Sequence, residues 1–422
     1  MKNEQIPQGH QGQCCPHGQG KGGHGHGGGR GHGAGHGQGC GHGHGHGEHC
    51  GRHGHGAQGH PGGHPGGHPE DKNPLRLLFW ELTSGCNLRC IHCRAVAQPE
   101  RVEGELSTQE CFSIIDNLVT FANPILVLTG GEPLYRPDFF DIAAYANSKG
   151  LRVAMATNGT LVTGENAKKI KDVGIQRVSI SLDGATAETH DAFRGIPGSF
   201  EAALRGFENL KKQGLSVQFN TTVAKHNLHE IKDILKLAVE KGADALHIFM
   251  LVPVGCGVEI ADEQMVSAET YEELLHWFYE ESKRVPIELK ATCAPHYHRV
   301  MRQRAKEEGI TLTFQSHGLA AVTKGCLAGS GVAFLSSKGK VQPCGYLPVT
   351  AGDIHEQSLQ EIWEKSEAFL ALREPDNLKG KCGVCEFRKV CEGCRARAFA
   401  QTGDYLGEEP YCAYKPRKYV QD

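Results

Sequence analysis

The chain has 422 residues, a formal net charge of −3, 17 cysteines and 25 histidines. This length exceeds that of one ordinary domain, and the near-neutral charge argues against a nucleic acid as the main partner. No run of about 18 apolar residues occurs, so we expect no membrane span, and the first residues contain no apolar signal segment. So many cysteines, in a chain that we expect in the cytoplasm, indicate metal sites rather than disulfides.

Residues 1–72 form a low-complexity tail that is rich in histidine and glycine. They hold 15 of the 25 histidines and 27 of the 56 glycines. Because such a segment can bury almost nothing against the entropy of ordering, we predict that it is disordered. Histidine-rich tracts bind divalent metals such as nickel and zinc. The tail is therefore either a metal-buffering segment or a solvated tail with incidental metal affinity.

Strands and helices alternate from residue 73 onward. We expect strands at 75–82, 125–128, 152–156, 177–182, 216–222 and 245–250, and helices at 109–122, 139–149, 165–173, 200–213 and 228–241. This repeated βα unit predicts a parallel sheet covered by helices, with ligands at the carboxyl ends of the strands. Residues 267–308 are expected to be helical and to end in a basic helix at 294–308.

The first predicted strand leads into three cysteines with the spacing Cys-x3-Cys-x2-Cys: Cys86, Cys90 and Cys93. Soft thiolates select iron–sulfur clusters, zinc or copper(I). A 4Fe–4S cluster normally takes four cysteines, so three of them in one loop leave one iron open. A zinc site more often has a fourth Cys or His at finger spacing, and His92 lies where the thiolates already crowd the loop. The alternatives are three unconnected thiols or half of a zinc knuckle.

This spacing resembles the signature of the radical S-adenosylmethionine (radical SAM) enzymes, and the resemblance covers most of residues 75–412. It implies an α/β fold, an open partial (β/α)6 barrel. It also implies a 4Fe–4S cluster whose open iron binds the methionine part of SAM, and a 5′-deoxyadenosyl radical that abstracts hydrogen. The electron would come from a donor such as ferredoxin or flavodoxin. His92 matches the family's aromatic position near the adenine.

Later motifs match positions that bind SAM in this family. One βα unit after the cysteine loop comes a motif that resembles the one holding the methionine amino group: Gly130, Gly131, Glu132 and Pro133. Asn158 and Ser181 are candidate contacts to the ribose or the carboxylate, with turn or strand-end chemistry as the alternative. Arg194 matches an arginine that contacts the SAM carboxylate, with a surface salt bridge as the alternative. Residues 251–257 resemble a segment that packs against adenine.

Seven further cysteines follow residue 309, and their pattern resembles the SPASM extension, which carries auxiliary 4Fe–4S clusters. By that resemblance one cluster is held by Cys382, Cys385, Cys391 and Cys412, and part of another by Cys326, Cys344 and Cys394. The chain departs from the family because only two residues separate Cys391 from Cys394 and because a cysteine shortly before Cys326 is missing. The second cluster then has an open iron, has a ligand other than cysteine, or does not exist. One or two zinc sites are the alternative to clusters.

We therefore predict a tail at 1–72, a partial barrel at 73–308 and an auxiliary iron–sulfur domain at 309–422.

Three stretches resemble the branch of the family that modifies tetrapyrroles, in particular the haem synthases of the alternative, siroheme-dependent pathway: residues 79–83, 290–299 and 391–397. That resemblance implies oxidative decarboxylation of two propionates of iron-coproporphyrin III to vinyl groups, which gives haem b. Arg299 and Arg302 are candidate partners of the propionates, because arginine pairs with carboxylates; a solvated basic helix is the alternative. The other hypotheses are a maturase of a ribosomal peptide, another tetrapyrrole-modifying radical SAM enzyme and a metal-binding chaperone.

Overall fold

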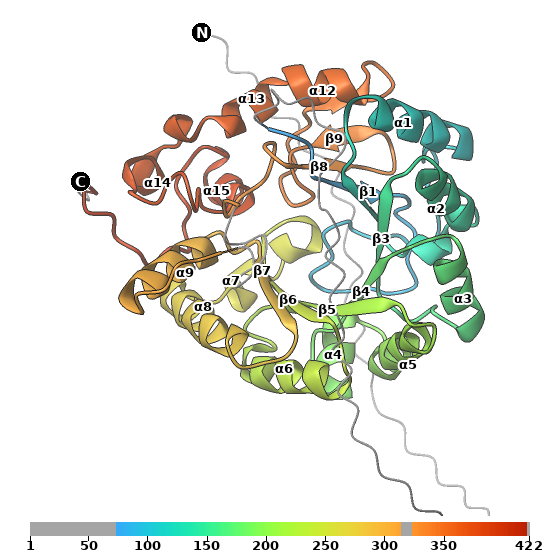
Figure 1. The fold of residues 1–422 in the computed structure, drawn as a ribbon, viewed down its shortest axis with the longest axis horizontal. Helices are drawn as coiled ribbons and strands as arrows, with labels where there is room; N and C mark the ends of the chain where they lie inside the picture. Colours follow the sequence, from blue (N-terminus) through green and yellow to red (C-terminus); the bar gives the residue numbers. More distant parts are fainter. Residues whose placement is uncertain (1–72, 314–322, 420–422) are drawn as a thin grey trace, which may run out of the picture. The chain divides into compact units, whose positions relative to one another are not determined.

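A computed structural model describes residues 73–313 and 323–419 of the chain (Figure 1). The disorder and metal binding predicted for residues 1–72 fall outside these residues. The described strands form one ten-stranded sheet in the order β10-β9-β8-β1-β2-β3-β4-β5-β6-β7. Its order differs from the chain order only where the strands that follow residue 309 join the edge at β1.

Strands β1 to β6 are parallel and follow one another in sequence order, as the repeated βα units predicted. Each strand has aliphatic residues at alternate positions, and these are buried: Leu78 and Leu126, for example, are partners in register and are both fully buried. The strands are β1 (Leu77–Glu81), β2 (Ile125–Thr129), β3 (Arg152–Thr157), β4 (Arg177–Ser181), β5 (Ser216–Val223) and β6 (Ala245–Met250).

The connecting helices are amphipathic and cover one face of the sheet. Helix α1 begins with a capping box between Ser107 and Glu110, which satisfies free N–H groups of its first turn. Helix α5 turns Phe200, Phe207 and Leu210 toward the core. The helices of this part are α1 (Thr108–Phe121), α2 (Phe139–Ser148), α3 (Gly164–Asp172), α4 (Ala187–Arg194), α5 (Ser199–Lys212), α6 (Ile231–Glu240) and α7 (Ala261–Gln264).

The expectation of a continuous helical segment at 267–308 is wrong in its middle. Between helices α8 (Ala268–Ser282) and α9 (His296–Glu307), residues Glu288–Thr292 form strand β7, which pairs in parallel with β6. The sequence Glu-Leu-Lys-Ala-Thr favours neither state clearly, and pairing with the open edge of β6 decides it. Helix α4 was also not expected.

The part after residue 309 extends the same sheet. Strand β8 (Val332–Leu335) pairs in parallel with β1, and β9 (Lys340–Gln342) and β10 (Gly352–Asp353) continue from it in antiparallel pairs. One sheet thus passes through both segments, and the domain boundary at residue 309 stays a prediction. The remaining helices are α12 (Leu359–Lys365), α13 (Glu367–Arg373), α14 (Gly380–Val384) and α15 (Arg395–Thr402).

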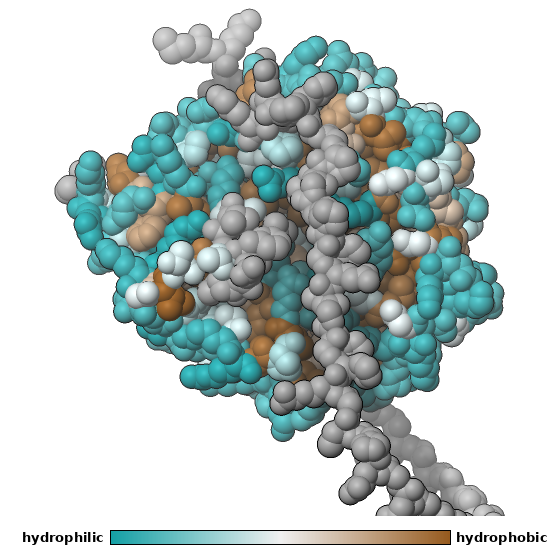
Figure 2. Space-filling view, viewed as in Figure 1, coloured by the Kyte–Doolittle hydropathy of each residue, from teal (hydrophilic) through white to brown (hydrophobic). Residues whose placement is uncertain are grey.

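The largest core lies between the sheet and its helices and includes fully buried Trp80, Phe139 and Phe219. In the space-filling view, hydrophilic residues predominate at the rim, over the outer helices, so these helices expose their polar faces to water (Figure 2). None of the described helices is long and apolar enough to cross a bilayer.

Candidate active site

The cysteine loop begins five residues after the end of β1 and is closed by its own backbone. The Cys86 N–H donates to the Gln98 carbonyl (2.8 Å), and the Gln98 N–H donates to the Ser84 carbonyl (2.9 Å). Inside the loop, the Leu88 N–H donates to Cys86 Sγ (3.4 Å) and the Ala97 N–H donates to Cys93 Sγ (3.5 Å). Amide donors to sulfur are typical of cysteines that hold iron–sulfur clusters, whose potentials they tune.

Glycines let the motif at 130–133 approach this loop closely. A Cβ on Gly131 would lie 2.4 Å from the Gly85 carbonyl oxygen, and a Cβ on Gly130 would lie 2.6 Å from that of Thr83. Two backbone bonds hold the contact: the Gly131 N–H donates to the Thr83 carbonyl and the Glu132 N–H donates to the Gly85 carbonyl, both at 2.8 Å. The motif is therefore a second wall of the cysteine loop rather than a plain turn.

Glu132 is a buried carboxylate that has only neutral hydrogen-bond donors. It accepts from the Thr157 hydroxyl (2.8 Å), the Asn158 N–H (2.8 Å) and the Leu134 N–H (3.2 Å). Burial raises the pKa of Glu132 to about 7, and these donors oppose the shift only in part. Such a carboxylate is ready to receive a cation, as an ammonium group would provide.

Asn158 links this pocket to the cysteines. Its Nδ2 donates to Asn87 Oδ1 (2.9 Å) and lies 3.8 Å from Cys86 Sγ. Burial raises the pKa of the Cys86 thiol to about 12, and the nearby Glu132 charge adds to the shift. The Asn158 side chain is thus a neighbour of the loop, and its predicted contact to SAM stays a prediction.

Arg194 ends helix α4 and is buried, so it is not the surface salt bridge that was its alternative. Its Nη2 lies 2.5 Å from Asp183 Oδ2, and its Nη1 donates to Cys90 Sγ at 3.6 Å. Burial raises the pKa of Cys90 to about 11, and the Arg194 charge opposes that shift. The backbone holds the same contact, because the Arg89 N–H donates to the Arg194 carbonyl (3.2 Å).

His92 stacks on Phe193 with ring centroids 4.0 Å apart, and Phe193 stacks in turn on His226 at 5.1 Å. Burial, together with the charge of Arg194, holds the pKa of His92 well below its usual range, so the imidazole is neutral. The segment predicted to pack against adenine lies beside it: the Cys256 N–H donates to the Cys93 carbonyl (2.9 Å). Together these residues make an apolar wall at the loop.

A polar row crosses the sheet on the face opposite helices α5 and α6. Because strand partners in register point to the same face, Ser181, Asn220, His247 and Lys290 share it. Gln218 joins the row, since its Nε2 donates to Asn220 Oδ1 (2.8 Å) and lies 2.9 Å from His247 Nδ1. Only Ser181 was singled out in the sequence. Strands β5 and β6 align Asn220 and His247 with it, and Lys290 joins the row through strand β7, which was not expected.

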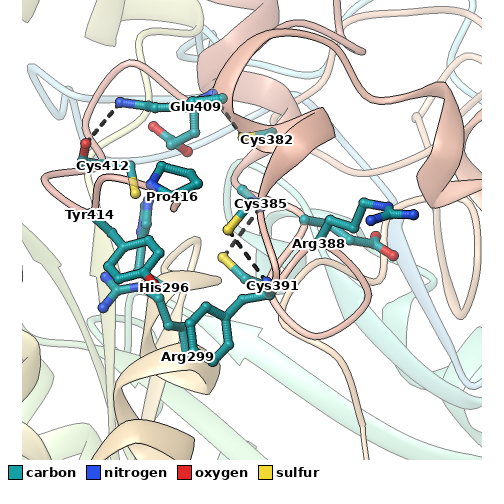
Figure 3. Close-up of a pocket in the computed structure, with 14 residues that line it drawn as sticks. His296, Arg299, Cys382, Cys385, Arg388, Cys391, Glu409, Cys412, Tyr414 and Pro416 are labelled. Carbon is teal, nitrogen blue, oxygen red and sulfur yellow. Dashed lines mark hydrogen bonds between the residues drawn. The ribbon is translucent and has the colours of Figure 1, made fainter. Parts of the chain in front are cut away.

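Four of the cysteines assigned to an auxiliary cluster line one pocket: Cys382, Cys385, Cys391 and Cys412 (Figure 3). Amide groups again donate to their sulfur atoms, from Phe387 to Cys385 and from Gly393 to Cys391, both at 3.4 Å. Cys382 Sγ accepts from the Glu409 N–H (3.3 Å) and from Arg395 Nη2 (3.6 Å). The predicted four-cysteine site is thus brought together from residues as far apart as α14 and the end of the described chain.

Arg299 and Arg302 lie on helix α9 but differ in their partners. Arg299 is buried, lines the auxiliary pocket and forms a bidentate pair with Glu272 of α8 at 2.7 and 2.5 Å. Its guanidinium also lies 4.8 Å from the Tyr414 ring centroid. Arg302 is half-buried and donates to the His298 carbonyl (3.4 Å), and no carboxylate of the described residues pairs with it. Of the two, only Arg302 keeps its charge for a ligand.

Comparison with known proteins decides the family. The chain is 58% identical over 346 residues to the AdoMet-dependent heme synthase of Methanosarcina barkeri, covering 82% of this chain and 98% of that protein. The chain belongs to the radical SAM superfamily. The sequence profile of that superfamily matches residues 80–238. The profile of SPASM, an iron-sulfur cluster-binding domain, matches residues 326–395. A second relative, the AdoMet-dependent heme synthase of Nitratidesulfovibrio vulgaris, is 51% identical and covers 85% of this chain and 98% of its own length.

The fold agrees with that assignment. The solved structure of Streptococcus suis SuiB bound to S-adenosylmethionine superposes with a TM-score of 0.63 at 16% identity, covering 81% of this chain and 78% of that chain. The predicted fold class is thereby confirmed. Membership of the radical SAM superfamily and the heme synthase relatives show that the protein is an enzyme. Its cofactors are S-adenosylmethionine, the 4Fe–4S cluster that binds it, and auxiliary iron–sulfur clusters in the SPASM domain.

The residues fit these cofactors. Among the described residues, Arg194 Nε is a buried donor without a hydrogen-bond partner, and Glu132 is a buried acceptor without a cation. These two groups suit the carboxylate and the ammonium of a methionine moiety. No three His, Cys, Asp or Glu side chains of the described residues converge as ligands of a single ion. A cluster of four irons offers each thiolate an iron of its own, so its ligands need not converge on one point.

Proposed function

We propose that this enzyme is a haem synthase, which converts iron-coproporphyrin III into haem b by oxidative decarboxylation of two propionates to vinyl groups. The observation that carries the proposal is the 58% identity over almost the whole length of a relative named AdoMet-dependent heme synthase. The resemblance of residues 79–83, 290–299 and 391–397 to that branch supports it.

The reaction requires a hydrogen atom to leave the β-carbon of each propionate. When bound, S-adenosylmethionine and the cluster at Cys86, Cys90 and Cys93 supply a 5′-deoxyadenosyl radical for this purpose. The carboxylate then departs as CO2, one electron is released per propionate, and the remaining two carbons form the vinyl group. We propose that Glu132 binds the ammonium of SAM and Arg194 its carboxylate, which fixes the direction of the abstraction. A ferredoxin or a flavodoxin remains the predicted electron donor.

A group of basic side chains supports binding of the substrate carboxylates. Burial lowers the pKa of His298 to about 4, and the charges of Arg302 and of Lys290, at the end of the polar row, contribute to this shift. Burial holds the pKa of His247 well below its usual range, and the charge of Lys290 adds to that shift. Cations that lie around the same buried histidine are stabilised by a bound anion. Propionates are such anions, and we propose Arg302 and Lys290 as their partners.

Two buried ring nitrogens without a hydrogen-bond partner point the same way. Among the described residues, His298 Nδ1 and His247 Nε2 are buried and have no hydrogen-bond partner. An unsatisfied buried polar atom costs about 1–3 kcal/mol, which a ligand oxygen would remove. Both histidines lie within the electrostatic reach of Lys290. A ligand with several carboxylates suits this surface better than a neutral one.

The test is an anaerobic reaction of the reconstituted full-length enzyme with SAM, dithionite and iron-coproporphyrin III. Mass spectrometry should show loss of two CO2 and of two hydrogens from the propionate β-carbons, with two carboxyl protons leaving as well. The variant with Cys86, Cys90 and Cys93 replaced by Ala is the control and should form no 5′-deoxyadenosine. An unchanged porphyrin together with a modified peptide from a neighbouring gene would assign the enzyme to the peptide maturases.

A further inference from the structure

Two segments that line the pocket of four cysteines carry an excess of basic side chains. Residues 381–389 and 411–419 together hold six lysines and arginines and a single carboxylate, that of Glu386. The whole chain, by contrast, has a formal net charge of −3. We call the six cations the basic rim: Lys381, Arg388, Lys389, Lys415, Arg417 and Lys418. The charge around this pocket is therefore opposite to that of the chain as a whole.

Direct contacts hold the two segments side by side. Lys381 Nζ donates to the Cys412 carbonyl at 2.8 Å. The Tyr414 hydroxyl donates to Glu386 Oε1 at 2.5 Å, and Arg417 Nε lies 3.8 Å from the same oxygen. The cations of both segments thus belong to one continuous part of the surface.

The basic rim lies at the mouth of the pocket. Lys381 and Arg388 line the pocket, and so does Pro416, which Lys415 and Arg417 flank in the sequence. Figure 3 shows Arg388 extending away from the cysteines, and the side chain of Arg417 is 88% exposed. The charges therefore face water rather than the thiols.

Half of the basic rim has no opposite charge in contact with it. Three of its lysines are exposed and form no ion pair with a carboxylate of the described residues: Lys389, Lys415 and Lys418. Two carboxylates reach the segments from elsewhere, since Asp376 pairs with Arg388 at 2.6 Å and Glu408 accepts from the Lys381 N–H at 2.7 Å. The cations remain in excess, and the three lysines can meet charges on another molecule.

An exposed apolar side chain lies between two of the cysteines. Val384 is 42% exposed, and it follows Cys382 and precedes Cys385 by two residues and by one. Cys385 and Cys412 are themselves only half-buried. A group that these thiolates hold is thus close to the surface, where an electron has a short path out. An apolar centre with a charged rim is also the usual composition of a protein interface.

The parts of the chain outside the described residues supply no opposing charge. Residues 1–72 contain four acidic and five basic side chains, and residues 314–322 contain no acidic side chain. The basic rim therefore lacks a complementary segment within its own chain. A partner of opposite charge has to be another molecule.

We propose that the basic rim and Val384 form the docking site of a small acidic protein that carries single electrons. Its negative charge is attracted to the rim at long range, and contact at Val384 brings its redox group toward Cys385 and Cys412. One electron then passes from the reduced auxiliary cluster to the oxidised carrier, so the cluster is oxidised and the carrier is reduced. The inference depends on an auxiliary cluster in this pocket and not on the identity of the substrate. A nucleic acid would meet the same cations, but it has no use for half-exposed cysteines at their centre.

The test is calorimetric titration of the reconstituted full-length enzyme with an oxidised, acidic 2Fe–2S ferredoxin, without SAM or porphyrin. Binding should be measurable at an ionic strength of about 0.01 M and should weaken strongly at about 0.15 M, because salt screens exposed charges. Lys389→Glu, Lys415→Glu and Lys418→Glu combined should weaken binding at least about tenfold at the lower ionic strength. Val384→Ser should weaken it about fivefold at both, since salt does not screen an apolar contact.

The matched control reverses three other exposed lysines that form no ion pair with the described residues: Lys212→Glu, Lys232→Glu and Lys338→Glu. It changes the net charge by the same amount and should bind ferredoxin within about threefold of the unchanged enzyme. Both triple variants should keep the iron content and the auxiliary electron paramagnetic resonance signal. After reduction by dithionite and desalting, the rim variant should reduce oxidised ferredoxin more slowly than the control does.

Three outcomes would overturn the proposal. One is equal binding by the rim variant and the unchanged enzyme, or no binding by either at low ionic strength. Another is an equal loss of affinity in the control, since net charge alone would then explain the effect. The third is a duplex oligonucleotide that binds to the rim more tightly than ferredoxin does. The salt dependence and Val384→Ser decide the question even if the triple variant fails to fold, and an unchanged porphyrin in the turnover assay would leave all of these measurements intact.

Discussion

Asp183 and Arg194 form a buried ion pair, 2.5 Å from Oδ2 to Nη2, directly beside the cysteine loop. Arg194 also donates to Cys90, and Asp183 lies 3.4 Å from His92 Nε2. The pair therefore joins the carboxyl end of β4 to two residues of the loop. Asp183 is anchored in turn, because the Thr222 N–H donates to its Oδ1 at 2.7 Å.

Replacing Arg194 by Met should destabilise the enzyme strongly, because it leaves the Asp183 carboxylate buried without its counter-charge. Removing one partner of a buried pair typically costs about 3–5 kcal/mol in the free energy of unfolding. Anaerobic urea unfolding measures the change. The control is Lys168→Met, which breaks the exposed pair with Asp172 (2.6 Å) and should cost at most about 1 kcal/mol. Equal effects of the two substitutions would contradict this account of the pair.

Binding of SAM should depend on pH through Glu132. Burial raises the pKa of this carboxyl from 4.5 to about 7, so the folded chain binds the proton more tightly than the unfolded chain. Its contribution to stability is therefore fully present below the unfolded pKa and is lost as the pH rises through about 7. An ammonium ligand needs the charged form, so affinity for SAM should instead rise over the same window.

Calorimetric titration with SAM at about pH 6 and about pH 8 measures this effect. Below the pKa of Glu132, the affinity for SAM should change by up to about tenfold per pH unit. Glu132→Gln should weaken SAM binding about ten- to a hundredfold, as expected for a lost charge-assisted hydrogen bond, and should flatten the profile. A glutamine variant that retains the pH dependence would show that another group is responsible.

Gly131→Ala should separate the SAM-binding motif from the cysteine loop. The new methyl group would lie 2.4 Å from the Gly85 carbonyl oxygen, and that backbone cannot yield without moving the loop. We expect the variant to lose about four irons after reconstitution and to lose SAM cleavage. Gly164→Ala is the matched control, because no atom lies within 4 Å of its Cβ position and it begins helix α3. An iron content equal to that of the control would argue against the close packing.

The elements that the sequence predicted well are those whose signal is local. Strands β1 to β6 contain alternating or continuous aliphatic residues, and the cysteine spacing lies within one loop. Strand β7 has no such signal, since only the open edge of β6 makes Glu288–Thr292 extended. The end of the polar row depends on that strand, so His247 and Lys290 were not recognised as neighbours.

Partners that are distant in the chain could not be predicted from spacing. Arg299 stood out as a basic residue on a helix, yet its charge is used by Glu272 of α8. Cys293 lies outside the spacing of the C-terminal cysteines, and only the three-dimensional arrangement brings it to Cys394. In both cases the sequence supplied the residue type, and tertiary packing supplied the partner.

The first 72 residues should be dispensable for catalysis. Their composition provides almost no side chains that could form the wall of a pocket. A chain that begins at Asn73 should keep its iron and its turnover and should lose most of its affinity for nickel or zinc. Iron analysis, turnover and titration with nickel measure the three properties. Loss of turnover with the clusters intact would show that the tail contributes to catalysis.

Arg302 and Arg299 should differ when each is replaced by Met, which keeps much of the packing of the stem and removes the charge. Arg302→Met should weaken binding of iron-coproporphyrin III about ten- to a hundredfold and leave the auxiliary clusters unchanged. Arg299→Met leaves the Glu272 carboxylate without its partner beside Cys385 and Cys391, so it should lower stability and alter an auxiliary cluster signal. Binding titration, unfolding and electron paramagnetic resonance distinguish the two.

Arg284→Met removes an exposed arginine paired with Glu281 at 3.3 Å and serves as the control for both. If Arg299→Met weakened substrate binding with its clusters and stability unchanged, the substrate carboxylates would have to lie at the auxiliary pocket instead of at the polar row.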